Sequence, residues 1–375
     1  MTEAIKVGII SAPERASDLT SRMIEELAND FSSEINNDTK WKVDRIVDSL
    51  IGSTTTASEI LDRTKDIKEE KEWNFAISVT DLPIFHRGHV VAGNVNQKDG
   101  VAQISIPAFG WIPIKQRIKK AIIQLVKELI GDKKFKNISS SQTITRTKDK
   151  SGRHKKNGFP VTFIRRYPIN ENKKNGIDIR YSVHPKINGL IRLFIGMIFA
   201  NNPLKIISSF KKIIAIAFTT GTFALIFPTV WQLSQVFSNF RLTMIMVAAI
   251  IGLVLWIIAA HRLWVFSSVQ DKTRIRHLYN LTTTSTLLID VITYYVILFS
   301  LFFITSALLV PTEHFVDTVS DEGKVTIGDY LRVAWVVSSL STIVSAIGAG
   351  LENEELVQDI TYGYRQIHRY EKSNR

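Results

Sequence analysis

The sequence contains no cysteine. Disulfides, thiolate nucleophiles and cysteine-based metal sites are therefore excluded. Two phosphate-binding patterns are also missing. The first strand-like run is followed by Ser11-Ala12-Pro13-Glu14 instead of the glycine series of a dinucleotide-binding turn, and the N-terminal region has no Gly-Lys-Ser/Thr loop. We expect no Rossmann cofactor site, predict no bound cofactor and assign no catalytic residue.

Charge is scarce in the second half of the chain. Up to about residue 186 charged and apolar residues alternate as in a soluble protein, whereas long uncharged runs follow from residue 213. The net charge of +12 is concentrated between residues 115 and 212, just before those runs. A basic segment beside a membrane attracts anionic lipid headgroups, so we predict membrane lipids as partners and no nucleic acid.

Four segments that are nearly free of charge have the roughly 20 residues needed to cross a bilayer. They comprise residues 213–236, 242–260, 287–310 and 331–351. These predict a helical transmembrane region over residues 204–351 that follows a soluble α/β domain.

The loops between these segments predict their orientation, because Lys and Arg collect on the cytoplasmic side. The basic residues lie before the first span and between the second and third, and include Lys205, Lys211, Lys212, Arg274 and Arg276. The loop after the third span is acidic. We therefore predict a multi-pass protein of the cell membrane with both termini in the cytoplasm, including a tail of residues 352–375.

The soluble region predicts an open, mostly parallel sheet with flanking helices over residues 1–132. Strand-like runs cover residues 5–10, 41–47, 75–79, 90–95 and 101–106, and helical patterns cover 14–31, 56–70 and 114–130. The first five elements follow the order βαβαβ.

Two short pieces connect this domain to the spans. Residues 133–186 are predicted to be a basic linker followed by a hairpin with strands at 161–166 and 177–183. Residues 187–203 include an apolar stretch that is too short to span a bilayer. It is expected either to lie in the headgroup plane or to dock under the soluble domain.

A ligand site is expected where the parallel strands end, because open α/β sheets bind ligands beyond the carboxyl ends of their strands. Ser11, Thr80 and Asp81 follow two of the predicted strands. Asp81 is the best polar candidate. The alternative is that Asp81-Leu82-Pro83 is simply a turn in which the carboxylate accepts backbone hydrogen bonds.

His86 and His89 are three residues apart and could both ligate a metal if the turn curled. No third ligand is evident nearby, so we predict an exposed turn and no metal site.

Asp290 lies about one turn inside the third predicted span. A charged group in a membrane is costly unless it is paired or hydrated, so it suggests a function by default. A structural role, in contact with interfacial water or with Arg274 or Arg276, competes with proton or ion transport.

Four short motifs resemble a family of poorly characterised bacterial multi-pass membrane proteins with an N-terminal α/β domain. They are Thr80-Asp81-Leu82-Pro83, Gly100-Val101 leading to Ser105-Ile106-Pro107-Ala108-Phe109-Gly110, Ala200-Asn201-Asn202-Pro203, and Leu278-Tyr279-Asn280. Members of that family are sometimes named 5,10-methylenetetrahydrofolate dehydrogenase. The resemblance thus implies a nicotinamide cofactor and a folate substrate, whereas the residues that such a site needs are not seen.

Three functions remain after these exclusions. The first is a non-enzymatic cytosolic domain that binds a ligand or partner and is tethered to the membrane. The second is a folate oxidoreductase that uses NAD(P), and the third is a small transporter or channel with Asp290 on its path. Four spans would form such a path only as a homo-oligomer, which Gly348 and Gly350 in the last span would permit.

Overall fold

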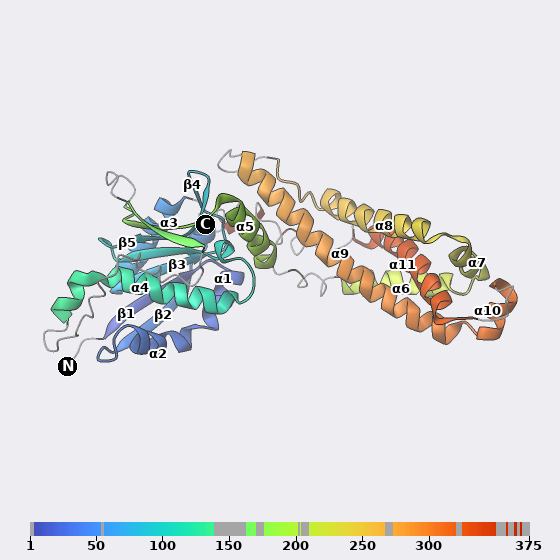
Figure 1. Cartoon of the computed structure of the whole chain (residues 1–375), viewed down its shortest axis with the longest axis horizontal. Coiled ribbons are helices and arrows are strands. Elements are labelled where there is room, and N and C mark those ends of the chain that lie inside the picture. The colour runs from blue at the N-terminus through green and yellow to red at the C-terminus, as the bar shows by residue number, and fades with distance from the viewer. Residues whose placement is uncertain are drawn as a thin grey trace. The chain divides into compact units, whose positions relative to one another are not determined.

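The computed structural model describes residues 4–53, 56–138, 163–169, 176–201, 203, 210–266, 273–319, 325–349, 358, 364–365 and 368–369. The chain forms two compact units (Figure 1). The first combines Met1–Ala200 with Gln366–Arg375, and the second is Asn201–Arg365. The helical unit is thus inserted between two parts of the α/β unit.

An eight-stranded sheet with the order β2-β1-β3-β6-β5-β8-β7 forms the centre of the first unit, and β4 pairs with β5. The strands are β1 Ile5–Ser11, β2 Trp41–Val47, β3 Phe75–Thr80, β4 Phe85–His86, β5 His89–Asn96, β6 Val101–Ser105, β7 Ile164–Pro168 and β8 Ile179–Val183. Every residue of β3 is buried, as expected for a strand covered on both faces.

The sheet is mixed, which corrects the expectation of a mostly parallel one. β2, β1, β3 and β6 are parallel, whereas β5, β8, β7 and β4 pair antiparallel. One reason is that the short turn between β5 and β6 makes these two strands antiparallel, and a second is that the predicted hairpin joins the sheet, since β8 pairs with β5. A hairpin strand needs only an unpaired edge to extend a sheet, and β5 provides that edge.

Helices cover both faces of the sheet, with α2 and α4 along one face and α3 on the other (Figure 1). The helices of this unit are α1 Arg15–Ser21, α2 Ile24–Glu34, α3 Ala57–Glu70, α4 Ile114–Ile138 and α5 Lys186–Ala200, with short 3₁₀ turns η1 Leu50–Gly52 and η2 Ile106–Phe109. Residues 14–31, predicted as one helix, are divided between α1 and α2. α4 extends past the predicted end at residue 130, with a non-helical Gly131.

The apolar stretch before the spans forms α5 and packs on η2. Leu193, Gly196 and Met197 are buried. A Cβ at Gly196 would overlap the backbone of Pro107, so the glycine permits the close approach. Two alternatives were expected for this stretch, a position in the headgroup plane or docking on the α/β unit. The inner face of α5 docks on the α/β unit.

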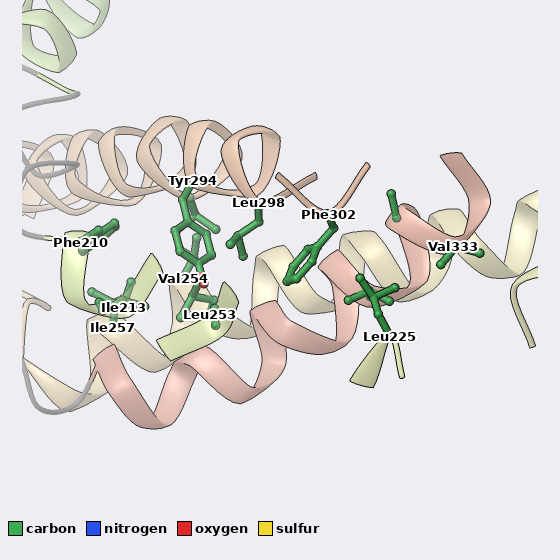
Figure 2. Close-up of a cluster of buried hydrophobic side chains, with 14 of the residues drawn as sticks. Phe210, Ile213, Leu225, Leu253, Val254, Ile257, Tyr294, Leu298, Phe302 and Val333 are labelled. Atoms are coloured by element: carbon green, nitrogen blue, oxygen red, sulfur yellow. The ribbon is translucent and has the colours of Figure 1, made fainter. Parts of the chain in front are cut away.

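The second unit contains α6 Lys211–Ala224, α7 Pro228–Val236, α8 Asn239–Ala260, α9 Thr273–Leu309, α10 Thr312–Val319 and α11 Ile327–Ala349. Its apolar core joins Tyr294, Leu298 and Phe302 of α9 to Leu253 and other side chains of α6, α8 and α11 (Figure 2).

Two described helices are long and apolar enough to cross a membrane, α8 and Ile275–Leu309 of α9. A third span is possible if α6 and α7 cross together, but they bend by 92° where Pro228 begins α7. In the described part of the chain, the structure therefore supports two of the four predicted spans, or three if the bent pair is one span. The fourth segment corresponds to α11, in which Arg332 and several serines lie among the apolar residues.

Some predicted features lie outside the described residues. These include Lys205, residues 139–162 of the linker, residues 170–175 of the hairpin turn, Gly350 of the last predicted span, most of the tail, and the side chain of Arg274.

Candidate functional site

The strand order brings the three predicted ligand-site residues to one edge of the sheet. β1 and β3 are adjacent and parallel, with Ser11 opposite Val79. The chain leaves β1 toward β2 on one side, and β3 lies on the other. The carboxyl ends of β1 and β3 thus flank the topological switch point, where open α/β sheets bind ligands. Ser11, Thr80 and Asp81 are all essentially inaccessible to solvent.

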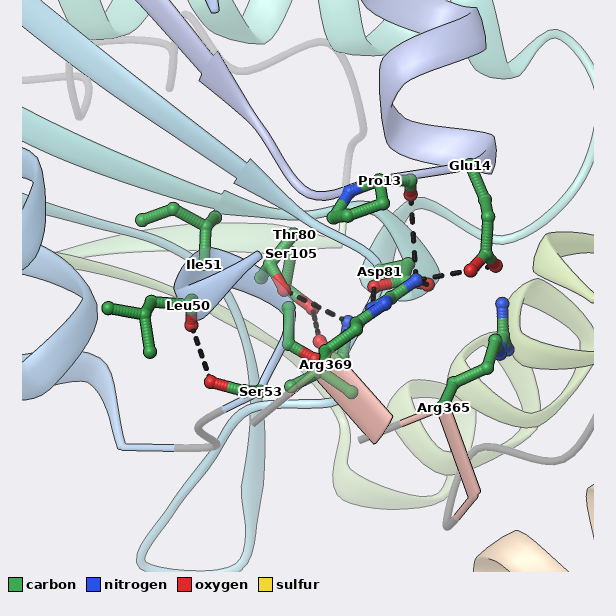
Figure 3. A network of polar contacts seen from close by, with 12 residues as sticks. Pro13, Glu14, Leu50, Ile51, Ser53, Thr80, Asp81, Ser105, Arg365 and Arg369 are labelled. Carbon is green, nitrogen blue, oxygen red and sulfur yellow. Dashed lines mark hydrogen bonds and ion pairs between the residues drawn. The ribbon is translucent and has the colours of Figure 1, made fainter. Parts of the chain in front are cut away.

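Asp81 accepts two hydrogen bonds from Arg369 near the end of the chain (Figure 3). Nη1 of the arginine lies 2.8 Å from Oδ1, and Nη2 lies 3.0 Å from Oδ2. The Asp81 side chain is 0% exposed and that of Arg369 is 5% exposed. This planar two-point contact is the geometry in which a guanidinium matches a carboxylate best.

Three further oxygen atoms surround the same guanidinium. Nη1 also donates to the carbonyl of Gly52 at 3.1 Å, and Nη2 approaches the carbonyl of Pro13 at 3.5 Å. The carboxylate of Glu14 lies 3.4 Å from Nη2. The pocket is therefore lined by oxygen acceptors, and a buried cation needs this because its desolvation is otherwise unfavourable.

Local backbone features shape this pocket. Glu14 has a φ of 61°, an uncommon value for a residue with a side chain, where β1 turns into α1. A Cβ at Gly52 would overlap the guanidinium, so only glycine leaves space there. The amide of Leu82 donates to Oγ1 of Thr80 at 3.2 Å, which turns the chain directly after Asp81.

No protein-family model, curated protein or solved structure matches this chain.

The sequence predicted only the part of this pocket that the strand ends form. Ser11 and Asp81 follow strands and could be found from the strand pattern, although Ser11 donates to the carbonyl of Ile46 at 3.3 Å rather than to Asp81. Arg369 was missed because it lies among several basic residues in a tail that was assigned to the cytoplasm as a group. No sequence pattern pointed to Gly52 or Glu14 as residues of this pocket.

Within the described ranges, no three His, Asp or Glu side chains are grouped to hold a metal. His86 and His89 face each other across the β4–β5 pair. The ring of His89 lies 4.3 Å from that of His184, centroid to centroid. His184 in turn contacts the Tyr167 hydroxyl at 2.9 Å through Nε2.

Asp290 occupies a polar region inside the helical unit. Asp290, Thr286 and Tyr294 lie one turn apart along α9 and are all fully buried. Asn201 donates to Oγ1 of Thr286 at 3.2 Å and accepts from Arg365 at 2.5 Å.

The basic residues of the predicted cytoplasmic face are described in part. Lys211 and Lys212 are exposed at the start of α6. Arg276 donates to the carbonyl of Phe266 at 2.8 Å.

Proposed function

We propose that this chain is a multi-pass protein of the cell membrane whose α/β unit faces the cytosol and binds a ligand or partner without transforming it. The single observation that carries the binding role is the buried carboxylate of Asp81 at the switch point of the sheet. Two apolar helices, and a third span if α6 and α7 cross together, support the membrane location.

The acceptors around Arg369 indicate the class of ligand. A pocket that holds one guanidinium through the Asp81 carboxylate and the Gly52 and Pro13 carbonyls suits a guanidinium group of another molecule equally well. A small guanidino compound or an arginine side chain of a partner would then replace Arg369. Specificity would come from the paired oxygens of Asp81, because an ammonium group cannot make the same planar contact.

Arg369 competes with such a ligand because it belongs to the same chain. A tethered group competes at an effective concentration that depends on its tether, and for short flexible linkers this is on the order of millimolar. A ligand must therefore overcome that concentration, and its binding would release the tail. In this way ligand binding at Asp81 would change the position of the segment that follows the helical unit.

Agmatine is a suitable probe, since it carries a guanidinium on a short alkyl stem. We would measure its binding by calorimetry to the full-length chain in detergent, as wild type and as Arg369→Ala. The variant is expected to bind agmatine more tightly than wild type because the competing side chain is gone.

Two controls make this result specific. Arg369→Ala combined with Asp81→Asn should lose binding, and Arg22→Ala, which removes an exposed arginine of the same unit, should behave as wild type. Putrescine should bind Arg369→Ala more weakly than agmatine. A correctly folded Arg369→Ala variant with no affinity for agmatine would refute the proposed ligand class.

The finer topology of four spans with cytoplasmic termini is part of the proposal, and the absence of cysteine makes it easy to test. Glu313→Cys and His277→Cys place single thiols at exposed positions on either side of α9. A membrane-impermeant maleimide should label position 313 on intact cells and position 277 only after permeabilisation. The reverse pattern would contradict the orientation.

A transporter or channel is the second candidate, and the buried Asp290 favours it. An ionisable group beside Thr286 and Tyr294 inside apolar helices is expected on an ion path. Proton or cation flux into liposomes that Asp290→Asn abolishes would support this function. A folate oxidoreductase is proposed only because of the family resemblance. Measurement of NADPH binding to the full-length chain would test it.

A further inference from the structure

The outer side of α5 is apolar and exposed, although its inner side packs on the α/β unit. Ile187 is 71% exposed and Ile191, one turn later, is 52% exposed. Trp111 and Ile112, in the loop after η2, are 50% and 66% exposed. Large apolar side chains that are exposed side by side in this way mark an interaction surface.

Printed contacts join these residues into one surface. Trp111 stacks on Phe199 at the end of α5, with ring centroids 4.2 Å apart and planes 5° apart. The side chain of Arg192 passes 3.8 Å from where a Cβ would stand on Gly110, next to Trp111. The guanidinium of Arg192 also lies over the ring of the exposed Phe163, 5.2 Å from its centroid. The loop, the helix and the start of β7 are therefore continuous.

Two arginines add positive charge to this surface. Arg117 donates through Nη1 to the carbonyl of Phe109 at 2.9 Å. Burial, and next the charge of Arg117, lower the pKa of Arg192. Within the described parts of the chain, Nη1 of Arg192 is buried and has no hydrogen-bond partner. Arg192 as a whole is only half-buried, so a phosphate group that approaches the accessible part of its guanidinium would lessen the repulsion between the two guanidinium groups.

We propose that the surface formed by Trp111, Ile112, Phe163, Ile187 and Ile191 lies against an anionic lipid bilayer, with Arg192 and Arg117 on a lipid phosphate. Aromatic and aliphatic side chains next to basic groups are the composition of interfacial membrane-binding helices. Chain connectivity favours this occupant, because ten residues join Ala200 to the start of α6 and extend no further than about 35 Å. The bilayer that the helical unit enters is thus always within reach.

The absence of cysteine allows one environment-sensitive fluorophore to be placed at a time. Ile112→Cys and Ile191→Cys report on the proposed surface. Lys42→Cys is the control, since its side chain is 63% exposed and β2 forms the sheet edge opposite β7. The labelled full-length chains are placed in nanodiscs of phosphatidylcholine with or without phosphatidylglycerol, and doxyl-labelled lipids serve as quenchers.

We expect a blue shift and lipid quenching at positions 112 and 191 but not at position 42, and a stronger effect with phosphatidylglycerol. Arg117→Gln with Arg192→Gln, in the chain labelled at position 112, should remove the dependence on phosphatidylglycerol. A label at 112 that behaves as the one at 42 overturns the proposal. So does a blue shift at position 112 that the doxyl-labelled lipids do not quench, which indicates cover by the chain itself, or one that depends on protein concentration, which indicates a second copy.

This inference depends on the proposed membrane insertion and is independent of the Asp81 site. The two failures are distinguishable. A chain that does not insert fails to enter the nanodiscs at all, whereas an inserted chain with an unquenched label refutes only the surface.

Discussion

Asp81 and Arg369 are 288 residues apart in the sequence and share two hydrogen bonds of 2.8 and 3.0 Å. This pair attaches the end of the chain to the sheet that the beginning of the chain builds. Both ends of the helical unit therefore lead into the same α/β unit, at Ala200 and at Gln366. The contact occupies the position at which a sheet of this kind offers a ligand site. It therefore holds the segment around Arg369 on the sheet and would also compete with a ligand for Asp81.

Removing one member of this pair should destabilise the α/β unit. Arg369→Met leaves the fully buried Asp81 carboxylate without its cation, and breaking a buried ion pair in this way costs about 3–5 kcal/mol. Adding Asp81→Asn should recover much of that loss, because no buried charge is left alone. Hydrogen exchange of β3 amides in the four chains of this double-mutant cycle measures the coupling.

The exposed pair Lys71 and Glu70 provides the comparison cycle, since its side chains are 46% and 65% exposed. Its coupling should be near zero, because solvent screens exposed pairs. Equal coupling in the two cycles would mean that the contact between Asp81 and Arg369 is no stronger than a surface pair.

Gly221 should tolerate no larger residue in the helical unit. A Cβ there would overlap the ring of Phe302 and the hydroxyl of Ser341, so α6 would have to move away from α9 and α11. Overpacking of this kind costs about 1–3 kcal/mol. Gly221→Ala should lower the temperature at which the detergent-solubilised chain loses monodispersity in size-exclusion chromatography.

Gly252→Ala is the matched control, because nothing lies within 4 Å of its Cβ position in α8. It should be neutral or slightly stabilising, since alanine favours a helix over glycine. A loss of stability as large as that of Gly221→Ala would show that packing against Phe302 is not the cause.

The β7–β8 edge of the sheet should weaken in mild acid. Burial, followed by the charges of His89, Arg165 and Lys186, lowers the pKa of His184, and the Tyr167 hydroxyl contacts its ring. The unfolded state therefore binds the proton more readily. The stability that neutral His184 contributes is complete above its unfolded pKa of about 6.5 and is lost as the pH falls below it toward the lowered folded value.

Hydrogen exchange of the β8 amides between about pH 7.5 and pH 5.5 would measure this loss after correction for intrinsic rates. His184→Gln should flatten the dependence, whereas His277→Gln, at an exposed position in α9, should not. An unchanged slope in His184→Gln would assign the pH dependence to another group.

Glu128 should link α4 to the hairpin in a second pH range. Burial by itself would raise the pKa of Glu128, but hydrogen bonds from Arg166 and Tyr181 hold it below its usual value. The stability it contributes is therefore present above the unfolded pKa of about 4.3 and disappears as the pH falls through the folded value.

Glu128→Gln should lose this contribution at neutral pH and show a smaller further loss in acid. Limited proteolysis between β7 and β8 across this range would test it. Glu34→Gln, which removes a more exposed partner of Lys127, is the control and should resemble wild type. Equal protease sensitivity of wild type and Glu128→Gln at neutral pH would contradict the link.

Local patterns determined much of the secondary structure. The run predicted as residues 41–47 is β2 itself, and residues 56–70 differ by one position from α3. These elements follow from apolar periodicity, which depends only on neighbours along the chain. The long uncharged runs likewise predicted helices, and α8 and α9 are long and apolar enough to span a membrane.

Tertiary structure decided what periodicity does not encode. The pattern of the hairpin predicted two strands, but not that β8 would pair with β5 and extend the antiparallel part of the sheet. Residues 213–236 read as one apolar run, yet helix formation restarts at Pro228 with a bend of 92°. Proline has no amide hydrogen and is compatible with the first turn of a helix, so the residue type was visible but the angle was not.

The candidate site divides in the same way. Sequence by itself placed Ser11, Thr80 and Asp81 at strand ends, because the alternation of strands and helices fixes where a parallel strand stops. Arg369 is one of several basic residues in the tail, and its local sequence does not distinguish it from the others. Only the folded chain, which brings Gly52, Glu14 and Pro13 around one guanidinium, selects this arginine, because burial among oxygen acceptors is a property of packing and not of sequence neighbours.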